Sequence, residues 1–382
     1  MKKLILSTLA IAALTFTSCS RDDDSTPATS GIININADDF KGELTAGQSA
    51  TLDPSLTYKL TGSFVIKAGA TLTIPAGTRI EATGGTSSYI AVAQDGLIYI
   101  NGTATSPVVM TSGKAVKATG DWGGLVICGR ANTNKGGANG ETATSEVGDL
   151  TYGGTETNDS SGVIKYLRVE YTGAAFNGDK EFNGVSLFGV GAGTTFEYVQ
   201  AYKSGDDGIE FFGGSVNAKY LIALHSEDDA IDFADGFSGS IEYAYIKDVA
   251  KAGIEGSNNG DNGAALPTTN ATLRNISIVK GALAGSEHAM FIKEGGGRWT
   301  AQNIYVQDFA KGIKINVATD APAVANVNAG FVTFSPIQFS NISGDFSEYN
   351  GSNTTYMTQG TATGAGSNGA TPSWTTGWTA GF

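Results

Sequence analysis

Cysteine, histidine and proline are scarce in this chain, which has two cysteines, two histidines and eight prolines among 382 residues. Because Cys19 belongs to a terminal segment described below, Cys128 has no partner for an intramolecular disulfide and is expected to be a small buried hydrophobe. The two histidines, His225 and His288, exclude a histidine-rich metal site. A Gly-rich phosphate loop, a Cys-x-x-Cys pair and a Gly-x-Ser-x-Gly elbow are also missing, which excludes the enzyme classes that rely on them.

Long hydrophobic runs are missing too. The longest, over residues 4–16, follows Lys2 and Lys3 and precedes Thr17, Ser18 and Cys19. A run of about 13 residues is too short to cross a bilayer as a helix, so the segment is expected to be a signal peptide. It resembles a bacterial lipoprotein signal, which implies cleavage after residue 18 and attachment of palmitate or a similar acyl chain to Cys19. An ordinary signal peptide with an incidental cysteine is the alternative.

The residues after Cys19, 20–24, read Ser-Arg-Asp-Asp-Asp. This stretch resembles the acidic export signal that sends lipoproteins of the Bacteroidetes to the outer face of the outer membrane. We therefore predict a signal peptide over residues 1–18, an acylated cysteine with a polar tether over 19–36, and a single domain over 37–382. The expected location is the cell surface, with a lipid anchor in the outer membrane.

Positive charge is in short supply, since 24 Lys and Arg stand against 37 Asp and Glu and the net charge is −13. Removal of residues 1–18 takes away two lysines and leaves a net charge of −15. A chain this acidic is a poor candidate for binding nucleic acid or anionic lipid. Cations or neutral partners fit better.

The most abundant feature of the chain is a short sequence motif, which is repeated from residue 164 to residue 343. Its clearest copies are TFEYVQAYKSGDDGIEFFGG, beginning at Thr195, and NAKYLIALHSEDDAIDFADG, beginning at Asn217. A repeat of about 20 to 50 residues predicts a solenoid. Alignment of the copies puts seven residues in one column: Tyr166, Tyr198, Tyr220, Tyr243, Asn275, Asn303 and Asn341.

The pattern within each copy indicates the kind of solenoid. Apolar and polar residues alternate with a period of two around the column, and a second short strand follows about eleven residues later. A unit of about 22 residues has no room for a helix or for the four strands of a propeller blade. The predicted fold is therefore all-β, a parallel β-helix. The 53 glycines suit its many tight corners.

Several segments of the chain resemble the sequences of one protein family: Ala70 to Thr78, Gly102 to Ser112, Gly120 to Leu125, Tyr152 to Gly154, Val163 to Tyr171, Phe212 to Tyr220 and Trp374 to Trp378. The family consists of largely uncharacterised Bacteroidetes surface lipoproteins with a pectin-lyase-like right-handed β-helix. The resemblance covers nearly all of the chain after the signal peptide. It implies the fold and says little about activity.

Two segments leave the repeat. Residues 130–160 are rich in Gly, Asn and Thr, and residues 256–270 lengthen one rung. Insertions in solenoids form loops on one face, often the binding face. Plain solvated loops are the alternative.

The second strands of successive copies align six residues in another column: Ser186, Glu210, Asp232, Glu255, Phe291 and Lys314. Apolar neighbours flank each member, so alternation turns the column outward. Three acids on successive rungs would lie roughly 5 Å apart, which is unfavourable unless something neutralises them. The preceding corners add more acids, and hard cations such as Ca²⁺ prefer several oxygen ligands. The candidate calcium ligands are Asp206, Asp207, Glu210, Asp228, Asp229, Asp232 and Glu255.

The following rungs are basic. In the alignment of the repeats, Lys251 occupies the same column as Asp206, and Lys311 occupies the same column as Asp207. The candidate ligand-binding cations are Lys251, Lys293, Arg298, Lys311 and Lys314. An acidic patch beside lysines resembles the calcium-plus-base arrangement of pectate lyases, and the run from Ser204 to Ile209 resembles the Gly-Asp-Asp-Cys motif of polygalacturonases. Gly208 replaces that cysteine, and the Asn-Thr-Asp and Gly-His-Gly motifs are absent.

Three interpretations of the acids stay open: structural corners, calcium binding and catalysis. Aspartate and asparagine are common at tight corners because their side chains bond nearby amides. The Asn275, Asn303 and Asn341 column is expected to be a structural ladder in a turn. Four aromatics are expected on the solvent side, where they would stack on sugar rings: Tyr202, Tyr245, Trp299 and Tyr305.

The leading hypothesis is a surface lipoprotein that binds an extended ligand, a polysaccharide or cell-surface glycan, along one flank of the β-helix. The first alternative is a calcium-dependent lyase or hydrolase acting on acidic polysaccharide through the Asp206 to Asp232 patch. The second is a structural or adhesive surface protein. A solenoid offers a long, regularly spaced groove, which favours the leading hypothesis of ligand binding, because function lies in the groove rather than in the fold.

Overall fold

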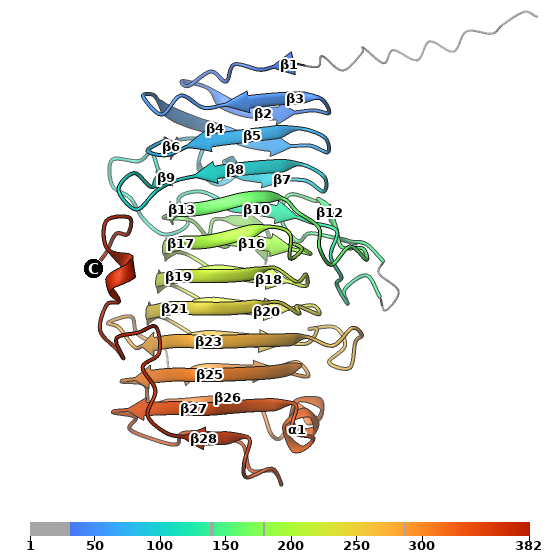
Figure 1. Cartoon of the computed structure of the whole chain (residues 1–382), viewed down its shortest axis with the longest axis vertical. Helices are drawn as coiled ribbons and strands as arrows, with labels where there is room; N and C mark the ends of the chain where they lie inside the picture. The colour runs from blue at the N-terminus through green and yellow to red at the C-terminus, as the bar shows by residue number, and fades with distance from the viewer. Residues whose placement is uncertain (1–30, 138–140, 179, 286–287) are drawn as a thin grey trace, which may run out of the picture.

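The computed structural model describes residues 31–382 except 138–140, 179 and 286–287. The predicted signal peptide and Cys19 lie outside the described residues. Within them the chain winds into a right-handed parallel β-helix, as predicted, with rungs stacked along one axis (Figure 1). Each rung presents strands to three flat sheets, which we call faces 1, 2 and 3. None of the helices in the described part is long and apolar enough to cross a membrane.

Face 1 begins with short strands and continues in the first halves of long ones. Its members are β1 (Gly31–Ile32), β3 (Gln48–Thr51), β5 (Thr71–Pro75), β8 (Leu97–Asn101), β13 (Gly162–Glu170), β17 (Thr195–Ser204), β19 (Asn217–Ser226), β21 (Ser240–Val249), β23 (Asn270–Val279), β25 (Arg298–Gln307), β27 (Val332–Ser340) and β28 (Met357–Gln359). Since β1 pairs with β3, the solenoid includes Gly31 and Ile32, which lie within the segment expected to be a tether.

Face 2 contains the second halves of the long strands, preceded by short strands in the first rungs. These are the start of β2 (Phe40–Leu44), the first part of β4 (Thr57–Ile66), β6 (Arg79–Ala82) and β9 (Val108–Ser112). The rest of β2 pairs with the second part of β4 on face 3. Face 3 contains the second part of β4, β7 (Ile90–Val92), β10 (Leu125–Cys128), β16 (Val185–Phe188), β18 (Ile209–Phe212), β20 (Ile231–Ala234), β22 (Ile254–Ser257), β24 (His288–Lys293) and β26 (Lys311–Ile315).

Several short elements lie outside the three faces. One antiparallel pair is β11 (Ala143–Thr144) with β12 (Thr151–Tyr152), and the other is β14 (Ala175–Asn177) with β15 (Lys180–Glu181). Helix α1 (Ala321–Asn328) lies near the last rungs, and single 3₁₀ turns span Gly85–Ser87 and Ser373–Thr375.

The column that runs from Tyr166 to Asn341 forms the bend between faces 1 and 2. All seven of its residues have a positive φ of 51° to 59°. This left-handed conformation costs non-glycine residues energy, but asparagine tolerates it. The Asn303 amide donates to Oδ1 of Asn275 at 2.8 Å, so the predicted asparagine ladder is confirmed for this pair. The tyrosines stack with ring centroids 4.3, 4.4 and 5.1 Å apart.

A continuous hydrophobic core fills the interior from Phe40 to Ile337. A second, smaller cluster lies outside the solenoid on face 3, where residues from the 130–183 region cover the outward side chains of the early strands. Cys128 belongs to this outer cluster and is buried, as predicted. The apolar packing of the covering region extends to Phe212 on β18. The acidic side chains occupy the outer surface of face 3 from β18 onward.

Candidate functional site

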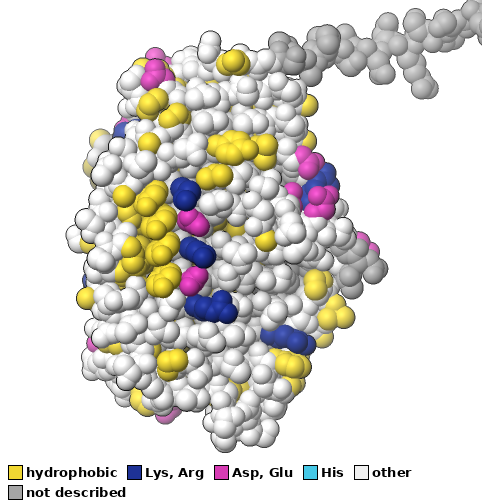
Figure 2. All heavy atoms as spheres, in the orientation of Figure 1, with side chains coloured by type: hydrophobic (Ala, Val, Ile, Leu, Met, Phe, Trp, Pro, Cys, Tyr) yellow, Lys and Arg dark blue, Asp and Glu magenta, His cyan; other side chains and the backbone are white. Residues whose placement is uncertain are grey.

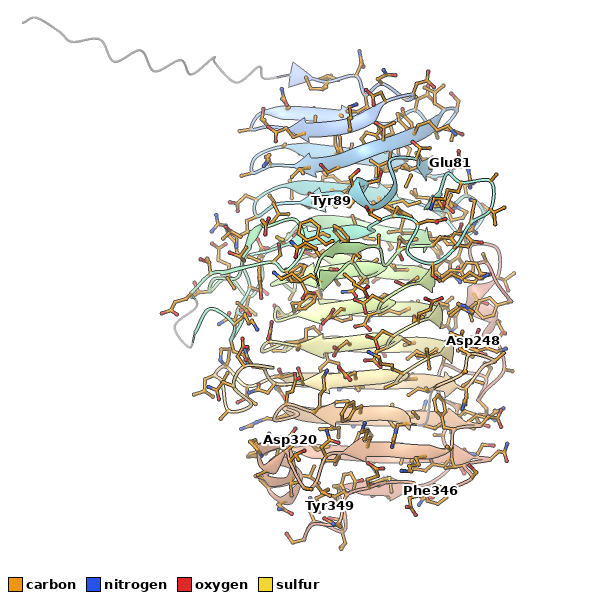
Figure 3. The ribbon with its side chains drawn as sticks, turned by 180° about the vertical axis from the view of Figure 1, so that it is seen from behind. Glu81, Tyr89, Asp248, Asp320, Phe346 and Tyr349 are labelled. Carbon is orange, nitrogen blue, oxygen red and sulfur yellow. The ribbon has the colours of Figure 1, made fainter. Side chains whose placement is uncertain are left out.

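One column of outward-facing side chains runs along face 3, on the side that Figure 3 shows from behind. Strand pairing aligns its members in order: Val126, Ser186, Glu210, Asp232, Glu255, Phe291 and Lys314. The predicted alignment from Ser186 to Lys314 is therefore confirmed. The character of the column changes from apolar through acidic to basic along the axis.

The corners that precede these strands stack in the same register. Because Ile209 pairs with Ile231, and Ile231 with Ile254, Asp206 lies above Asp228 and Asp207 above Asp229. Oδ1 of Asp207 accepts a hydrogen bond from the Asp229 amide at 2.8 Å, and the Asp229 carboxylate accepts one from the amide of the next corner. These two aspartates therefore serve the backbone of the following rung, as the structural interpretation expects.

The acids of column and corners line one hollow of about 420 Å³, which we call the acid hollow. All seven candidate calcium ligands lie on its wall. Its full lining is Glu146, Glu181, Asp206, Asp207, Glu210, Asp228, Asp229, Asp232, Lys251, Glu255 and Lys293. Glu146 and Glu181 were not predicted, because they come from the covering region, which follows no repeat.

Burial and mutual repulsion raise the pKa of most of these carboxyls. Burial and the neighbouring Asp228 raise the pKa of Asp206 to about 7. Burial, followed by the charge of Asp232, raises the pKa of Glu210 well above its usual range. The pKa of Asp232 is raised by burial and by Glu255. The hollow therefore binds protons or cations readily.

Two buried oxygens beside the acid hollow accept no hydrogen bond from any described residue: Oδ1 of Asn183 and Oδ1 of Asp232. The Asn183 amide donates to Glu210 at 2.6 Å and to Ser186 at 3.2 Å, which fixes its oxygen on the other side. Oδ1 of Asp228 is a different case, because it lies 2.6 Å from Nζ of Lys251 and is paired with that ammonium group. Unsatisfied buried acceptors are costly, so Oδ1 of Asp232, a residue that lines the hollow, points to a missing positive partner there.

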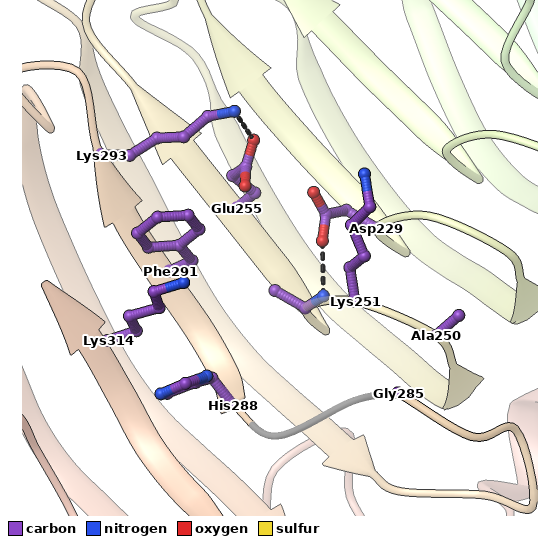
Figure 4. A pocket seen from close by; sticks show the side chains of 10 residues that line it. Asp229, Ala250, Lys251, Glu255, Gly285, His288, Phe291, Lys293 and Lys314 are labelled. Carbon is purple, nitrogen blue, oxygen red and sulfur yellow. Dashed lines mark hydrogen bonds and ion pairs between the residues drawn. The ribbon is translucent and has the colours of Figure 1, made fainter. Parts of the chain in front are cut away.

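A second hollow of about 400 Å³ adjoins the first, and we call it the lysine hollow (Figure 4). Its lining is Asp229, Ala250, Lys251, Ala252, Glu255, Gly285, His288, Phe291, Lys293 and Lys314. Nζ of Lys314 lies 4.2 Å from the ring centroid of Phe291. Nζ of Lys293 lies 2.5 Å from Glu255. Burial alone would lower the pKa of Lys293, but Glu255 holds it above its usual range.

A third hollow of about 360 Å³ extends the groove sideways to Asp320, which Figure 3 labels near the lower end of this side. Lys293 lines all three hollows. Asn259, Gly260 and Gly263 of the predicted 256–270 insertion form part of the third wall. The three hollows therefore form one groove along face 3.

Three of the five predicted basic residues line this groove: Lys251, Lys293 and Lys314. The other two lie elsewhere. The guanidinium of Arg298 stacks on Phe331, with its carbon 3.9 Å from the ring centroid. Lys311 does follow the Asp207 column, but it lies several rungs away and its Nζ contacts Glu348 at 2.8 Å.

The expectation of solvent-facing aromatics is wrong for three of its four residues. Trp299 is fully buried in the main core, because it points inward at the start of β25. Tyr245 and Tyr305 face outward but are buried, because the chain returns over face 2 in its last twenty residues. The Tyr245 hydroxyl donates to the carbonyl of Gly369 at 3.0 Å. Only Tyr202 keeps partial exposure.

Comparison with protein-family models agrees with this architecture. The model of a family described as a pectate-lyase-like β-helix domain matches residues 42–379. No curated protein matches the chain. A solved structure similar to it is that of the Dettilon tailspike protein, at 11% identity and a TM-score of 0.30. The match covers 82% of this chain and 62% of the tailspike chain, so this chain spans less than two thirds of that protein.

Proposed function

Since the chain belongs to the family of pectate-lyase-like β-helix domains, we propose that it binds an extended glycan in the groove along face 3. The observation that carries the proposal is the junction of the two hollows. An acidic and a basic hollow lie side by side and share four residues, Asp229, Lys251, Glu255 and Lys293. A chain-like ligand with regularly spaced polar and anionic groups suits this succession along the rungs.

The lysine hollow supplies the groups that an acidic sugar requires. Lys314 offers its ammonium group to a carboxylate or sulfate, and Lys251, which is also paired with Asp228, adds positive charge. Phe291, whose ring lies under the Lys314 ammonium, adds aromatic surface. Amphipathic sugar rings pack on such surfaces while their polar edges form hydrogen bonds. The substrate class that fits is therefore an acidic polysaccharide rather than nucleic acid.

The acid hollow is proposed to bind Ca²⁺. Its walls offer carboxylate oxygens, the ligands that calcium prefers, and the unsatisfied Oδ1 of Asp232 fits a cation. Asp206, Asp207, Glu210, Asp228 and Asp232 are the residues that would hold it. Glu255 is already paired with Lys293, and Asp229 bonds the next rung. A bound calcium ion would supply positive charge for a uronate carboxylate at the junction of the hollows.

The rival proposal is an enzyme that cleaves acidic polysaccharide. The observation in its favour is Asp206, whose pKa of about 7 suits a general acid or base at neutral pH and which lies within hydrogen-bond reach of Asp228. The neighbouring acids raise the pKa of Lys251 and of Lys293, so these lysines would stay protonated and stabilise negative charge that develops on the substrate. A structural or adhesive role without a small ligand is the third proposal.

We further propose that acylated Cys19 anchors the protein at the outer membrane, with the β-helix on the cell surface. The proposal is based on the Lys2 to Cys19 pattern and the acidic residues that follow it. Replacement of Cys19 by Ser should release the protein from the membrane fraction. Unchanged membrane attachment and no incorporation of labelled palmitate in the natural protein would contradict the anchor.

Binding is tested with polygalacturonate as an acidic probe and dextran as a neutral one, in calcium and in EDTA. We expect polygalacturonate to bind in calcium, and Lys314→Ala to weaken it at least about tenfold, or ~1.4 kcal/mol. The matched control is Lys165→Ala, which removes a lysine from face 1. Equal affinities for Lys314→Ala and the natural protein would contradict the groove. New reducing ends in the same mixtures would favour the enzyme over the binding protein.

A further inference from the structure

We propose that the acid hollow holds two divalent cations side by side, with Asp207 as their shared ligand. The inference rests on the proposed cation function of this hollow and deepens it. It concerns the number of ions and the residues that distinguish them.

The geometry divides the ligands into two overlapping groups of three. In one group, carboxylate oxygens of Asp206, Asp207 and Asp228 lie within 4.8 Å of one another. In the other group, carboxylate oxygens of Asp207, Glu210 and Asp232 also lie within 4.8 Å of one another. Asp206 and Asp228 come from stacked corners, whereas Glu210 and Asp232 come from paired positions on β18 and β20. Asp207 belongs to both groups, because it occupies the corner that leads into β18.

An unsatisfied oxygen in the second group points to a ligand independently of the acid count. The Asp232 side chain is more than nine-tenths buried, lines the hollow, and its Oδ1 accepts no hydrogen bond from the described residues. A buried acceptor of this kind is unfavourable unless something satisfies it.

Asp207 has the coordination capacity to be shared. Its Oδ1 accepts the Asp229 amide, and its second oxygen has no such backbone partner among the described contacts. A carboxylate has about four lone-pair positions, so the amide leaves room for bonds to two cations.

Charge also favours two ions over one. The hollow has nine carboxylates and two lysines on its wall, a formal charge of −7. Both lysines are engaged, Lys251 with Asp228 and Lys293 with Glu255. One divalent cation would offset less than a third of this charge, whereas two would offset more than half.

The experiment measures how many ions bind to the folded domain. Calcium is titrated at pH 8 by calorimetry, and Tb³⁺ luminescence provides a second readout. We expect two ions for the natural protein, and one each for Asp206→Asn and Asp232→Asn, because each substitution removes a ligand of a different group. Asp207→Asn should weaken both ions at least about tenfold, and Asp38→Asn, an exposed acid near the first rung, should leave both unchanged.

A single ion in the natural protein, or Asp207→Asn with one site at full affinity, would overturn the inference. The latter would mean separate sites. If Asp207→Asn does not fold, as judged by circular dichroism, the comparison of Asp206→Asn with Asp232→Asn still decides: loss of the same ion in both would overturn it. One ion would leave the proposed calcium function intact, whereas no ion would remove both. Binding of polygalacturonate in EDTA is measured separately and tests the groove alone.

Discussion

At the scale of single residues, the unusual feature is a set of carboxyl groups that lie close to one another in a largely buried hollow. Glu210, Asp232 and Glu255 follow each other on paired strands, where like charges are unfavourable. Lys293 neutralises Glu255, but no lysine contacts Glu210 or Asp232 at ion-pair distance among the described residues. These acids are therefore expected to hold protons in the absence of cations.

This expectation predicts how stability depends on pH. The pKa of Asp206 is about 7 in the folded protein, against an ordinary value of 3.8. Between these values the folded state keeps a proton that the unfolded chain has released, so stability falls as pH rises through this window. We expect the protein in EDTA to lose on the order of 2 kcal/mol of unfolding free energy between pH 5 and pH 8.

Urea unfolding at the two pH values measures this loss. Calcium at pH 8 should restore stability, and Asp206→Asn should reduce the pH dependence in EDTA. Equal or higher stability at pH 8 in EDTA would show that the acids of the hollow do not repel one another as described.

At the scale of elements, the rung is built around one backbone bend. The bend residue is tyrosine in four rungs and asparagine in three, and the two types support it differently. Asparagine tolerates a positive φ, whereas tyrosine gains from stacking on its neighbours. Beside the tyrosines, face 1 has an alternating ladder of charges, visible in Figure 2, in which Lys165 contacts Glu197 and Lys219 contacts Glu242.

Substitution of Tyr198, in the middle of the stack, separates these contributions. Both Tyr198→Asn and Tyr198→Val lose the ring contacts with Tyr166 and Tyr220. Only valine is also strained at φ 57°, because β-branched residues rarely adopt this conformation. We expect Tyr198→Val to be less stable than Tyr198→Asn by about 1–3 kcal/mol in urea unfolding. Equal stabilities would mean that the bend relaxes when the stack is lost.

The repeat made the rungs and the acidic column predictable from sequence. Strand pairing copies the alignment of the repeats, so Ser186 to Lys314 could be placed residue by residue. Glu146 and Glu181 could not, since they approach the hollow from segments without a period. The burial of Tyr245 and Tyr305 was missed for the same reason, because a returning terminal segment leaves no mark in the alternation of the strands that it covers.

At the scale of the whole molecule, a solenoid is a chain of nearest-neighbour contacts, and its rungs can unfold separately. Here the last twenty residues run back along the outside, in red in Figure 1, and contact rungs far apart. Thr363 bonds Asn303 at 2.7 Å, and Ala365 bonds Ser277 at 2.9 Å. Further back, Ala380 exchanges two hydrogen bonds with Gln200. This segment joins rungs that would otherwise have no direct contact.

Trp378 is the anchor whose removal tests this coupling. It is fully buried, and its ring lies 5.9 and 6.0 Å from the rings of Tyr166 and Tyr198. Trp378→Ala should cost about 3–5 kcal/mol, as for other buried tryptophans. Since the lost contacts lie on β13, β17 and β19, hydrogen exchange should quicken in these strands while β25 stays protected, and the calorimetric transition should broaden. Phe382→Ala, at the half-exposed last residue, is the control. A uniform increase in exchange over all rungs would instead mean that the solenoid unfolds as one unit without help from its terminal segment.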